Sequence, residues 1–446
     1  MTPQTPSHAI TGQAAAWSSL SRVRSRVVHR SVIVSALALA TVVSGAASLV
    51  HGQAGPSLSR VDRVAAGLPE APLQAATAVL QKHVDDHKVA GAVAMVARRG
   101  TLGYVATIGY QDIEQRVPMS ERTLFRIYSM TKPVTAVAVM MLFEQGRFQL
   151  DDPVSKYLPE FSTMAVRDVS GATHPPARAI TIRDLLLHIS GLEHRTSALY
   201  RDAQVRSRSI DLPQFVRNIV RVSLMEDPGT RYRYSESTTV LGRLVEVWSG
   251  QTFDAFLQSR VFAPLRMVDT SFFASPAQRP RLATVYTPEA GGVLRPIEIE
   301  AVPFTERPAL LEGAVGLLST GPDFLRFSQM LLNRGELDGV RLLKSETVDA
   351  MVRNDLPDAV LAARGNGVMG WGLGNVNIVM KPESLRYPAN RGEYGWDGTA
   401  GTIFWNDPAT GSVILLLTQS SPPDPDNLRQ RFKTAIQPAI VAGRAN

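Results

Sequence analysis

A serine and a lysine three residues apart, Ser129 and Lys132, could together form a nucleophile. At the start of a helix, side chains with this spacing leave the same face within one turn. A serine hydroxyl attacks a carbonyl only when a neighbouring base takes its proton, and a lysine with a pKa lowered by burial can be that base. The Ser-x-x-Lys spacing occurs once in the chain, but an ordinary helix start with a solvated lysine has the same pattern. The spacing alone leaves both interpretations open.

The composition excludes several other kinds of chemistry. The 446 residues contain no cysteine, which rules out disulfides, thiol nucleophiles and thiolate zinc sites. His83 and His87 lie four apart in a predicted helix but lack the glutamate of a zinc-protease motif, so we expect no metal. The chain has no Gly-x-Ser-x-Gly elbow, no phosphate-binding glycine loop and no basic aromatic stripe. We therefore expect no cofactor and no nucleic-acid partner.

The first 54 residues have the features of an export signal. They contain no acidic residue, and their four arginines leave 7 − 4 = +3 of the +7 formal charge for the remainder. Residues 31–59 contain no Asp, Glu, Lys or Arg. Gly52 and Ala54 are small residues at the spacing of a signal-cleavage site, and the helix-breaking residues Gly55 and Pro56 follow them. We expect export with cleavage after Ala54, with Ala47 as a second candidate. The alternative is an uncleaved anchor, because the apolar run is nearly long enough to span a bilayer. Any membrane contact would then be confined to this segment.

The elements that must position Ser129 and Lys132 come from both ends of the chain. The periodicity predicts a helix over residues 69–87, then two strands over 91–98 and 102–108. A helix opens near Ser129 and ends at Gly146. Further predicted helices cover 182–188, 212–222, 238–248, 253–261 and 426–441, and further predicted strands cover 367–378, 401–406 and 412–419.

This order predicts an α+β fold. One antiparallel sheet is expected to assemble from both chain ends, with terminal helices covering it and a mainly helical region inserted between. After a signal or anchor at 1–54, a single hydrolase domain is expected over 55–446. Its sheet part would cover about 70–130 and 310–446, and its mainly helical part about 131–309. The active site would lie between these two parts.

The sequence around Ser129 resembles that of the serine β-lactamase-fold hydrolases. The resemblance rests on several motifs in the same order along the chain, which are far more specific together than any one alone. They are residues 125–133 around Ser129, 150–154, 182–192, 228–235, 316–320 and 395–402. The resemblance covers about residues 73–439 and is strongest to the class C-like branch. That branch contains class C β-lactamases, certain DD-peptidases and the family VIII carboxylesterases, and it implies a fold of the β-lactamase and penicillin-binding-protein type.

The resemblance implies roles for three residues. Ser129 is the nucleophile, Lys132 its base or the partner of the base, and Tyr234 exchanges the proton with the attacking hydroxyl and the leaving group. A tyrosine with its ordinary pKa near 10 can do this only if a cation such as Lys132 stabilises the phenolate. Which of the two is the formal base stays open. His188, beside a Ser-Gly-Leu turn, is interpreted as a structural histidine.

Two motifs depart from the lactamase pattern. Glu236 stands where lactamases have an asparagine, and a carboxylate can only accept hydrogen bonds. Trp396, Asp397 and Gly398 stand where lactamases have Lys-Thr-Gly, and the family VIII esterases similarly have a tryptophan at the first place. By resemblance, the N–H groups of Ser129 and Thr399 form the oxyanion hole, and Gly398 permits close approach of the substrate.

These departures predict the substrate class. In lactamases the lysine of the Lys-Thr-Gly motif binds the substrate carboxylate through its positive charge, which the indole of Trp396 cannot replace. Asp397 and Glu236 would repel a substrate carboxylate. We therefore expect an exported serine carboxylesterase for short, uncharged, small-molecule esters. The alternatives are a β-lactamase or DD-peptidase, an acyltransferase to an acceptor other than water, and a catalytically silent scaffold of the same fold. The oligomeric state is left open.

Overall fold

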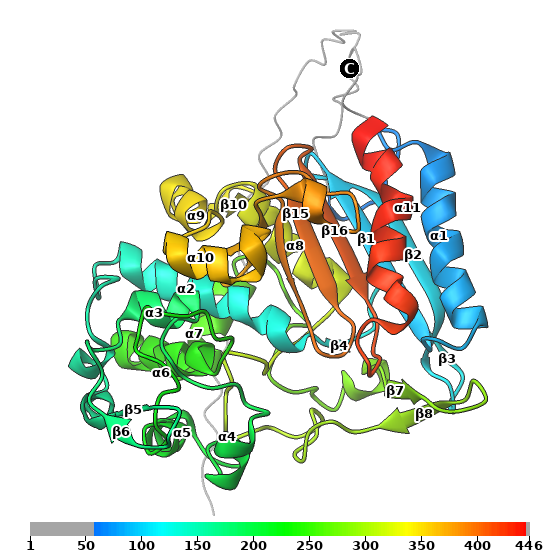
Figure 1. The fold of residues 1–446 in the computed structure, drawn as a ribbon. Helices are drawn as coiled ribbons and strands as arrows, with labels where there is room; N and C mark the ends of the chain where they lie inside the picture. The colour runs from blue at the N-terminus through cyan, green and yellow to red at the C-terminus, as the bar shows by residue number, and fades with distance from the viewer. Residues whose placement is uncertain (1–57, 443–446) are drawn as a thin grey trace, which may run out of the picture. The chain divides into compact units, whose positions relative to one another are not determined.

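An eight-stranded antiparallel sheet forms the centre of the computed structural model, which describes residues 58–442 (Figure 1). Its strand order is β12-β13-β14-β15-β16-β1-β2-β3. The N-terminal strand β1 pairs with the C-terminal strand β16, with Val93 opposite Leu417. The strands are β1 Gly91–Arg98, β2 Thr101–Asp112, β3 Val117–Pro118, β12 Met369–Trp371, β13 Asn377–Val379, β14 Tyr394–Asp397, β15 Ile403–Asp407 and β16 Ser412–Leu417. The predicted sheet built from both chain ends is confirmed.

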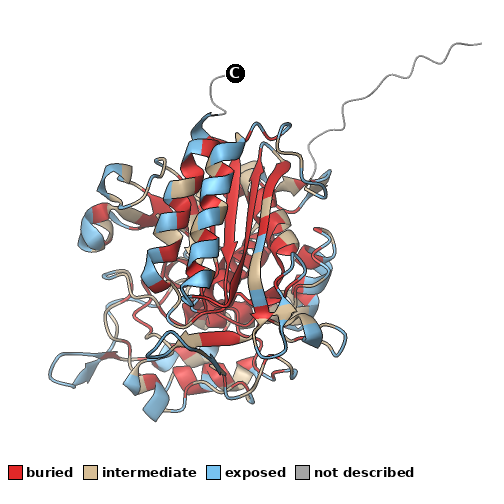
Figure 2. Ribbon diagram, turned by 90° about the vertical axis from the view of Figure 1, so that its right-hand side faces the viewer, coloured by how far each residue is buried: buried red, intermediate tan, exposed pale blue. Residues whose placement is uncertain are grey.

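Two terminal helices cover one face of this sheet, as the sequence predicts. They are α1, Glu70–Asp85, and α11, Leu428–Ala442. Leu73, Ala76 and Leu80 recur at helical spacing in α1 and are buried with Phe432 and Ile436 of α11. Figure 2 shows the exposed outer sides of these helices in front of buried strands. Removal of these apolar side chains from water holds this layer together.

The two histidines near the end of α1 do not share a helical face. His83 is buried in the last turn, and its Nδ1 lies 2.7 Å from the carbonyl oxygen of Val79. The helix ends at Asp85, and His87 has a left-handed backbone with φ of 53°. The expectation that both lie on one helix is wrong, because the turn into β1 begins before His87.

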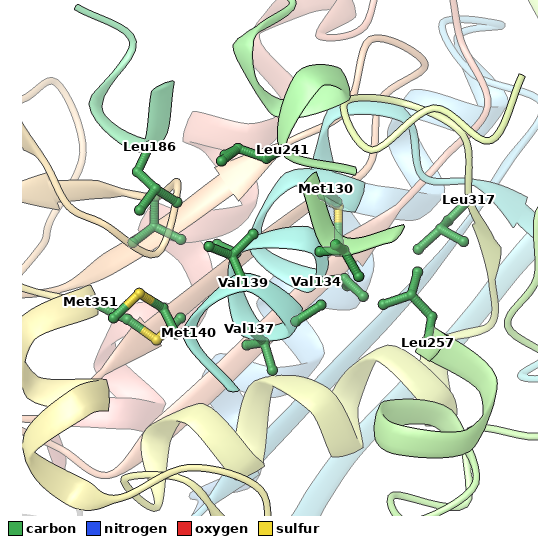
Figure 3. Packing of buried hydrophobic residues seen from close by; sticks show 14 of the residues in the cluster. Met130, Val134, Val137, Val139, Met140, Leu186, Leu241, Leu257, Leu317 and Met351 are labelled. Carbon is green, nitrogen blue, oxygen red and sulfur yellow. The ribbon is translucent and has the colours of Figure 1, made fainter. Parts of the chain in front are cut away.

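The opposite face of the sheet packs against α8, Gly321–Leu332, and the apolar core on that side also contains α2, Thr131–Glu144. Almost every residue of α2 is buried, so α2 is a central helix rather than an amphipathic one. Figure 3 shows Val134, Val137 and Met140 of α2 among apolar side chains from several other elements. This surrounding core fixes the residues at the start of α2.

The middle of the chain is mainly helical, with short two-stranded pairs between the helices. Its helices are α3 Ile182–Leu187, α4 Ala198–Asp202, α5 Leu212–Ile219, α6 Ser237–Ser249, α7 Phe253–Leu257, α9 Ser345–Met351 and α10 Asp358–Ala363. Its short strands are β4 Phe125–Arg126, β5 Val166–Arg167, β6 Thr173–His174, β7 Val285–Pro288, β8 Leu294–Ile297, β9 Leu318–Ser319, β10 Glu336–Leu337 and β11 Val340–Arg341. The predicted helices are present, but α5 ends at Ile219, earlier than predicted. The helix predicted over 253–261 consists of α7 and the π-helical segment Gln258–Phe262 that continues it.

Two features at the edge of the sheet differ from the prediction. Residues 367–378, expected as one strand, form the hairpin β12–β13, because Asn375 has a left-handed backbone and Gly372 N–H donates to Val376 O. The strand β14 is not predicted by the sequence pattern. A Cβ at Gly395 would lie 2.0 Å from Phe404 O, so this strand needs a glycine that obscures its period-two pattern.

The predicted signal or anchor at 1–54 lies outside the described residues and stays a prediction. Between residues 58 and 442, no helix is both long and apolar enough to cross a bilayer.

Candidate active site

Ser129 lies in a 3-10 turn, Tyr128–Met130, that runs directly into α2. Tyr128 has φ of 41°, a left-handed conformation that costs a non-glycine residue about 1–3 kcal/mol. The buried Tyr128 ring packs edge-on against Phe304, with 5.8 Å between ring centroids, and this packing holds the turn. Ser129 is 8% exposed. The turn therefore presents the serine at the end of a buried helix.

Lys132 is buried beneath Ser129 in the first turn of α2, with 2% exposure. Its Nζ donates to Ala314 O at 3.0 Å and lies 4.5 Å from the centroid of the Tyr234 ring. Burial lowers the pKa of Lys132 to about 7, although the negative charge of Glu236 acts in the opposite direction. Near neutral pH a large share of Lys132 is thus an uncharged amine that can accept a proton.

Tyr234 lies in the loop before α6 and joins Ser129 to the third motif. Burial raises the pKa of Tyr234 well above 10, while hydrogen bonds with the Ser129 and Trp396 side chains act in the opposite direction. Trp396 Nε1 donates to the Tyr234 hydroxyl at 3.1 Å. At neutral pH the Tyr234 hydroxyl is therefore protonated. Of the two groups, Lys132 is the one whose protonation changes near neutral pH.

An aromatic frame surrounds Tyr234. Its ring lies 4.9 Å from His188 and 5.6 Å from His194, and Trp396 packs edge-on against Trp371 with 4.7 Å between centroids. His188 is fully buried, and its Nδ1 accepts the Ser235 N–H at 3.3 Å. Burial lowers the pKa of His188 well below 6.5. These contacts give His188 a packing role against Tyr234.

Sequence reasoning missed His194 and Trp371 as parts of the site. His194 follows the Ser-Gly-Leu turn by two residues and stacks on Tyr234. Burial, and then the charge of Lys132, lower the pKa of His194 to about 4, so its ring is neutral at ordinary pH. Trp371 carries no local signal, because its position is set by a hydrogen bond from Nε1 to Leu186 O, 185 residues away along the chain.

The third motif brings the end of β14 against the turn that carries Ser129. A Cβ at Gly398 would lie 2.5 Å from Ile127 O, so this close approach requires glycine. Thr399 follows on the exposed side, and its N–H has no acceptor within residues 58–442. The close approach of Gly398 to Ile127 thus places Thr399 next to the turn that carries Ser129.

The two acidic residues expected to face the substrate are engaged elsewhere. Glu236 is 1% exposed, and its carboxylate accepts from Thr239 Oγ1 at 2.6 Å. Along β14, Trp396 and Asp397 point to opposite faces of the sheet. Asp397 therefore points toward α11, where it forms an ion pair with Arg429. The expected pair of unpaired negative charges in the cleft is not present, because one carboxylate is buried and the other is neutralised.

A cavity of about 580 Å³ lies behind the third motif. Tyr387, Trp405 and Arg429 border it on the α11 side of β14. The Trp396 indole points away from that side and toward Tyr234. Trp396 also lines this cavity, so the residue that contacts Tyr234 borders it as well.

The activity is expected to depend on the protonation of Lys132. If the neutral amine takes the serine proton, kcat/KM should fall about tenfold per pH unit below a pKa of about 7 and level off above it. Glu236→Gln removes the largest of the negative charges that raise this pKa and should move the acid limb to lower pH. The measurement is kcat/KM for an uncharged ester between about pH 5 and 9.

The exposed Glu383→Gln variant is the matched control for this measurement, because it removes the same charge at a distance. An acid limb that moves equally in both variants, or that does not move in Glu236→Gln, would contradict the assignment of the titration to Lys132.

The chain is similar to several known proteins. A model of the family described as Beta-lactamase matches residues 76–437. The protein Rv1367c of Mycobacterium tuberculosis is 35% identical over 362 residues, with 77% of this chain and 89% of that protein covered. Esterase EstB of Burkholderia gladioli is 32% identical over 369 residues, with 77% and 89% covered. The structure of EstCE1, a hydrolase with promiscuous acyltransferase activity, superposes with a TM-score of 0.70 at 25% identity, covering 83% of this chain and 98% of its own. The matched range contains every site residue described above.

Proposed function

We propose a specific reaction for this chain, which belongs to the beta-lactamase family and has the serine β-lactamase fold. Its relatives support ester hydrolysis or acyl transfer in that fold. The proposed reaction is hydrolysis of a short, uncharged carboxylic ester through an acyl-enzyme on Ser129. The observation that carries the proposal is the buried Lys132, with a pKa near 7, packed against a tyrosine that is hydrogen-bonded to Ser129.

The proposed mechanism has two halves. In the first, Ser129 Oγ attacks the ester carbonyl carbon, and its proton passes through the Tyr234 hydroxyl to neutral Lys132. The N–H groups of Ser129 and Thr399 stabilise the negative oxygen of the tetrahedral intermediate. The same proton then goes to the departing alcohol, which leaves the acyl group on Ser129. In the second half a water molecule attacks the acyl-enzyme by the same route and releases the acid.

The proposed substrate class rests on Trp396 and on the pairing of Arg429. The Trp396 indole offers one donor, already used by Tyr234, and an apolar face suited to an uncharged group. Arg429, the nearby cation, is neutralised by Asp397. Among residues 58–442, the third motif therefore offers no unpaired cation to the carboxylate of a β-lactam or of a peptide C-terminus.

The expected result is a clear preference for esters over lactams. The same preparation of the purified domain should give a higher kcat/KM for p-nitrophenyl acetate and butyrate than for nitrocefin, because nitrocefin carries a carboxylate that nothing in the third motif neutralises. The measurement is a side-by-side kinetic assay. Nitrocefin turnover equal to or above ester turnover would replace the proposal with a β-lactamase or DD-peptidase.

Acyl transfer is a second candidate, supported by the similarity to EstCE1, a hydrolase with promiscuous acyltransferase activity. The reaction would share the acyl-enzyme and differ only in the acceptor, an alcohol in place of water. Product analysis of the same ester assay with added primary alcohol distinguishes the two, since transfer yields a new ester in addition to the free acid.

A further inference from the structure

Arg429 holds the third motif from behind the sheet. It lies in the first turn of α11, and its side chain is 13% exposed. Its guanidinium forms an ion pair with Asp397, donates to Gly398 O at 3.1 Å and donates to Thr402 O at 3.4 Å. The Arg429 backbone N–H in turn donates to the Asp424 carboxylate at 2.9 Å, which anchors the helix start. One side chain thus ties three residues of the third-motif turn to α11.

Arg429 is linked to the proposed oxyanion hole by a single peptide group, the one between Gly398 and Thr399. The carbonyl of Gly398 and the N–H of Thr399 belong to the same trans peptide, so they are coplanar and point in opposite directions. A donor that holds the carbonyl on the α11 side therefore directs the N–H toward the opposite side, where Ser129 lies. A cationic donor on the carbonyl also polarises the peptide, which strengthens the N–H as a donor.

Hydrogen bonds within the third-motif turn hold part of its backbone without Arg429. Gly401 N–H also donates to Gly398 O, at 3.1 Å, and Gly398 N–H donates to Thr402 O at 2.7 Å. The turn therefore keeps its outline without the arginine. Ser420 N–H also bonds the turn from outside, at Ala400 O. What Arg429 adds is a positive charge and a bond from outside the turn to the Gly398 carbonyl itself.

We propose that Arg429 is a positioning residue for the oxyanion hole, which acts by orienting and polarising the Gly398–Thr399 peptide. Asp397 holds the guanidinium in place and is part of the same device. This inference rests on the proposed function, in which the Thr399 N–H stabilises the tetrahedral intermediate. It assigns Asp397 a task on the α11 side of β14 in place of contact with substrate.

The test compares Arg429→Met with Arg429→Lys and with Arg431→Met. Arg431 lies in the same helix turn, and its guanidinium contacts Asp426 rather than the third motif. The readouts are kcat and KM for p-nitrophenyl butyrate and the inhibition constant of a trifluoromethyl ketone, whose tetrahedral adduct places an oxyanion in the hole.

Arg429→Met should lower kcat about tenfold or more with little change in KM, and should weaken the ketone by a similar factor. The loss should be smaller than the 10²–10³-fold cost of deleting an oxyanion donor, since the N–H is still present. Arg429→Lys keeps a cation and should recover part of both losses, whereas Arg431→Met should match the wild type. A merely structural role would lower the thermal midpoint without this parallel loss of kcat and ketone affinity.

Arg429→Met with kcat and ketone affinity within about twofold of wild type would overturn the inference, as would equal losses in Arg431→Met. If Arg429→Met does not fold, Asp397→Asn provides the second route, because it frees the guanidinium while leaving α11 intact, and it should show the same parallel losses.

A fluorophosphonate probe separates this inference from the proposed function. Failure to label wild-type Ser129 would overturn the proposed function, whereas normal labelling of an unimpaired Arg429→Met variant would overturn only the role of Arg429.

Discussion

Ser129→Ala should reduce ester turnover by a factor on the order of 10³ or more, because it removes the hydroxyl that forms the acyl-enzyme in the proposed mechanism. Ser129 is the residue that combines a hydrogen bond to Tyr234 with a place one helical turn before the buried Lys132. The variant should keep its fold, since the serine side chain is small and the Tyr128 packing that holds the turn is untouched. The measurement is the release of p-nitrophenol, with circular dichroism as the check on folding.

Covalent labelling makes this prediction specific to one atom. A fluorophosphonate probe should add one label to the wild-type protein and to Ser162→Ala, an exposed control, and none to Ser129→Ala. Loss of labelling would also exclude the catalytically silent alternative for the wild type. A label that persists in Ser129→Ala would show that another residue is the nucleophile.

Lys132→Ala and Tyr234→Phe should each lower kcat by a factor on the order of 10² or more. The lysine variant removes the group that receives the proton, and the phenylalanine variant removes the hydroxyl that contacts both Ser129 and Trp396. Because the proton crosses both groups in one path, the loss in the double variant should be much smaller than the product of the two single losses. The measurement is a double-mutant cycle on kcat for p-nitrophenyl butyrate.

Lys132→Arg is the informative control for this cycle. It keeps a positive charge that cannot be removed at neutral pH, so it should be as inactive as Lys132→Ala if the lysine works as a neutral base. Fully multiplicative losses in the double variant, or an active Lys132→Arg protein, would contradict the shared proton path.

Local patterns in the sequence account for much of the fold. The period of 3.6 in residues 70–85 and the alternation in β1 and β16 depend on neighbours a few positions away, so they can be recognised without a structure. Strand β14 cannot be recognised from its own periodicity. Its residues, Gly395 among them, are determined by contacts with β15 and with the Ser129 turn.

The amino-acid sequence by itself placed Ser129 and Lys132 within one helical turn, and its resemblance to the β-lactamase-fold hydrolases added Tyr234. Only the tertiary structure decided their chemical state. The pKa of Lys132 depends on burial under residues near Ala314 and Tyr234, far away in the chain. The surroundings of Asp397 likewise come from the tertiary structure, because its ion-pair partner Arg429 lies in α11, 32 residues further on. The residue type determines which protonation states a side chain can have. Desolvation and partners from distant segments then determine which of these states is stable.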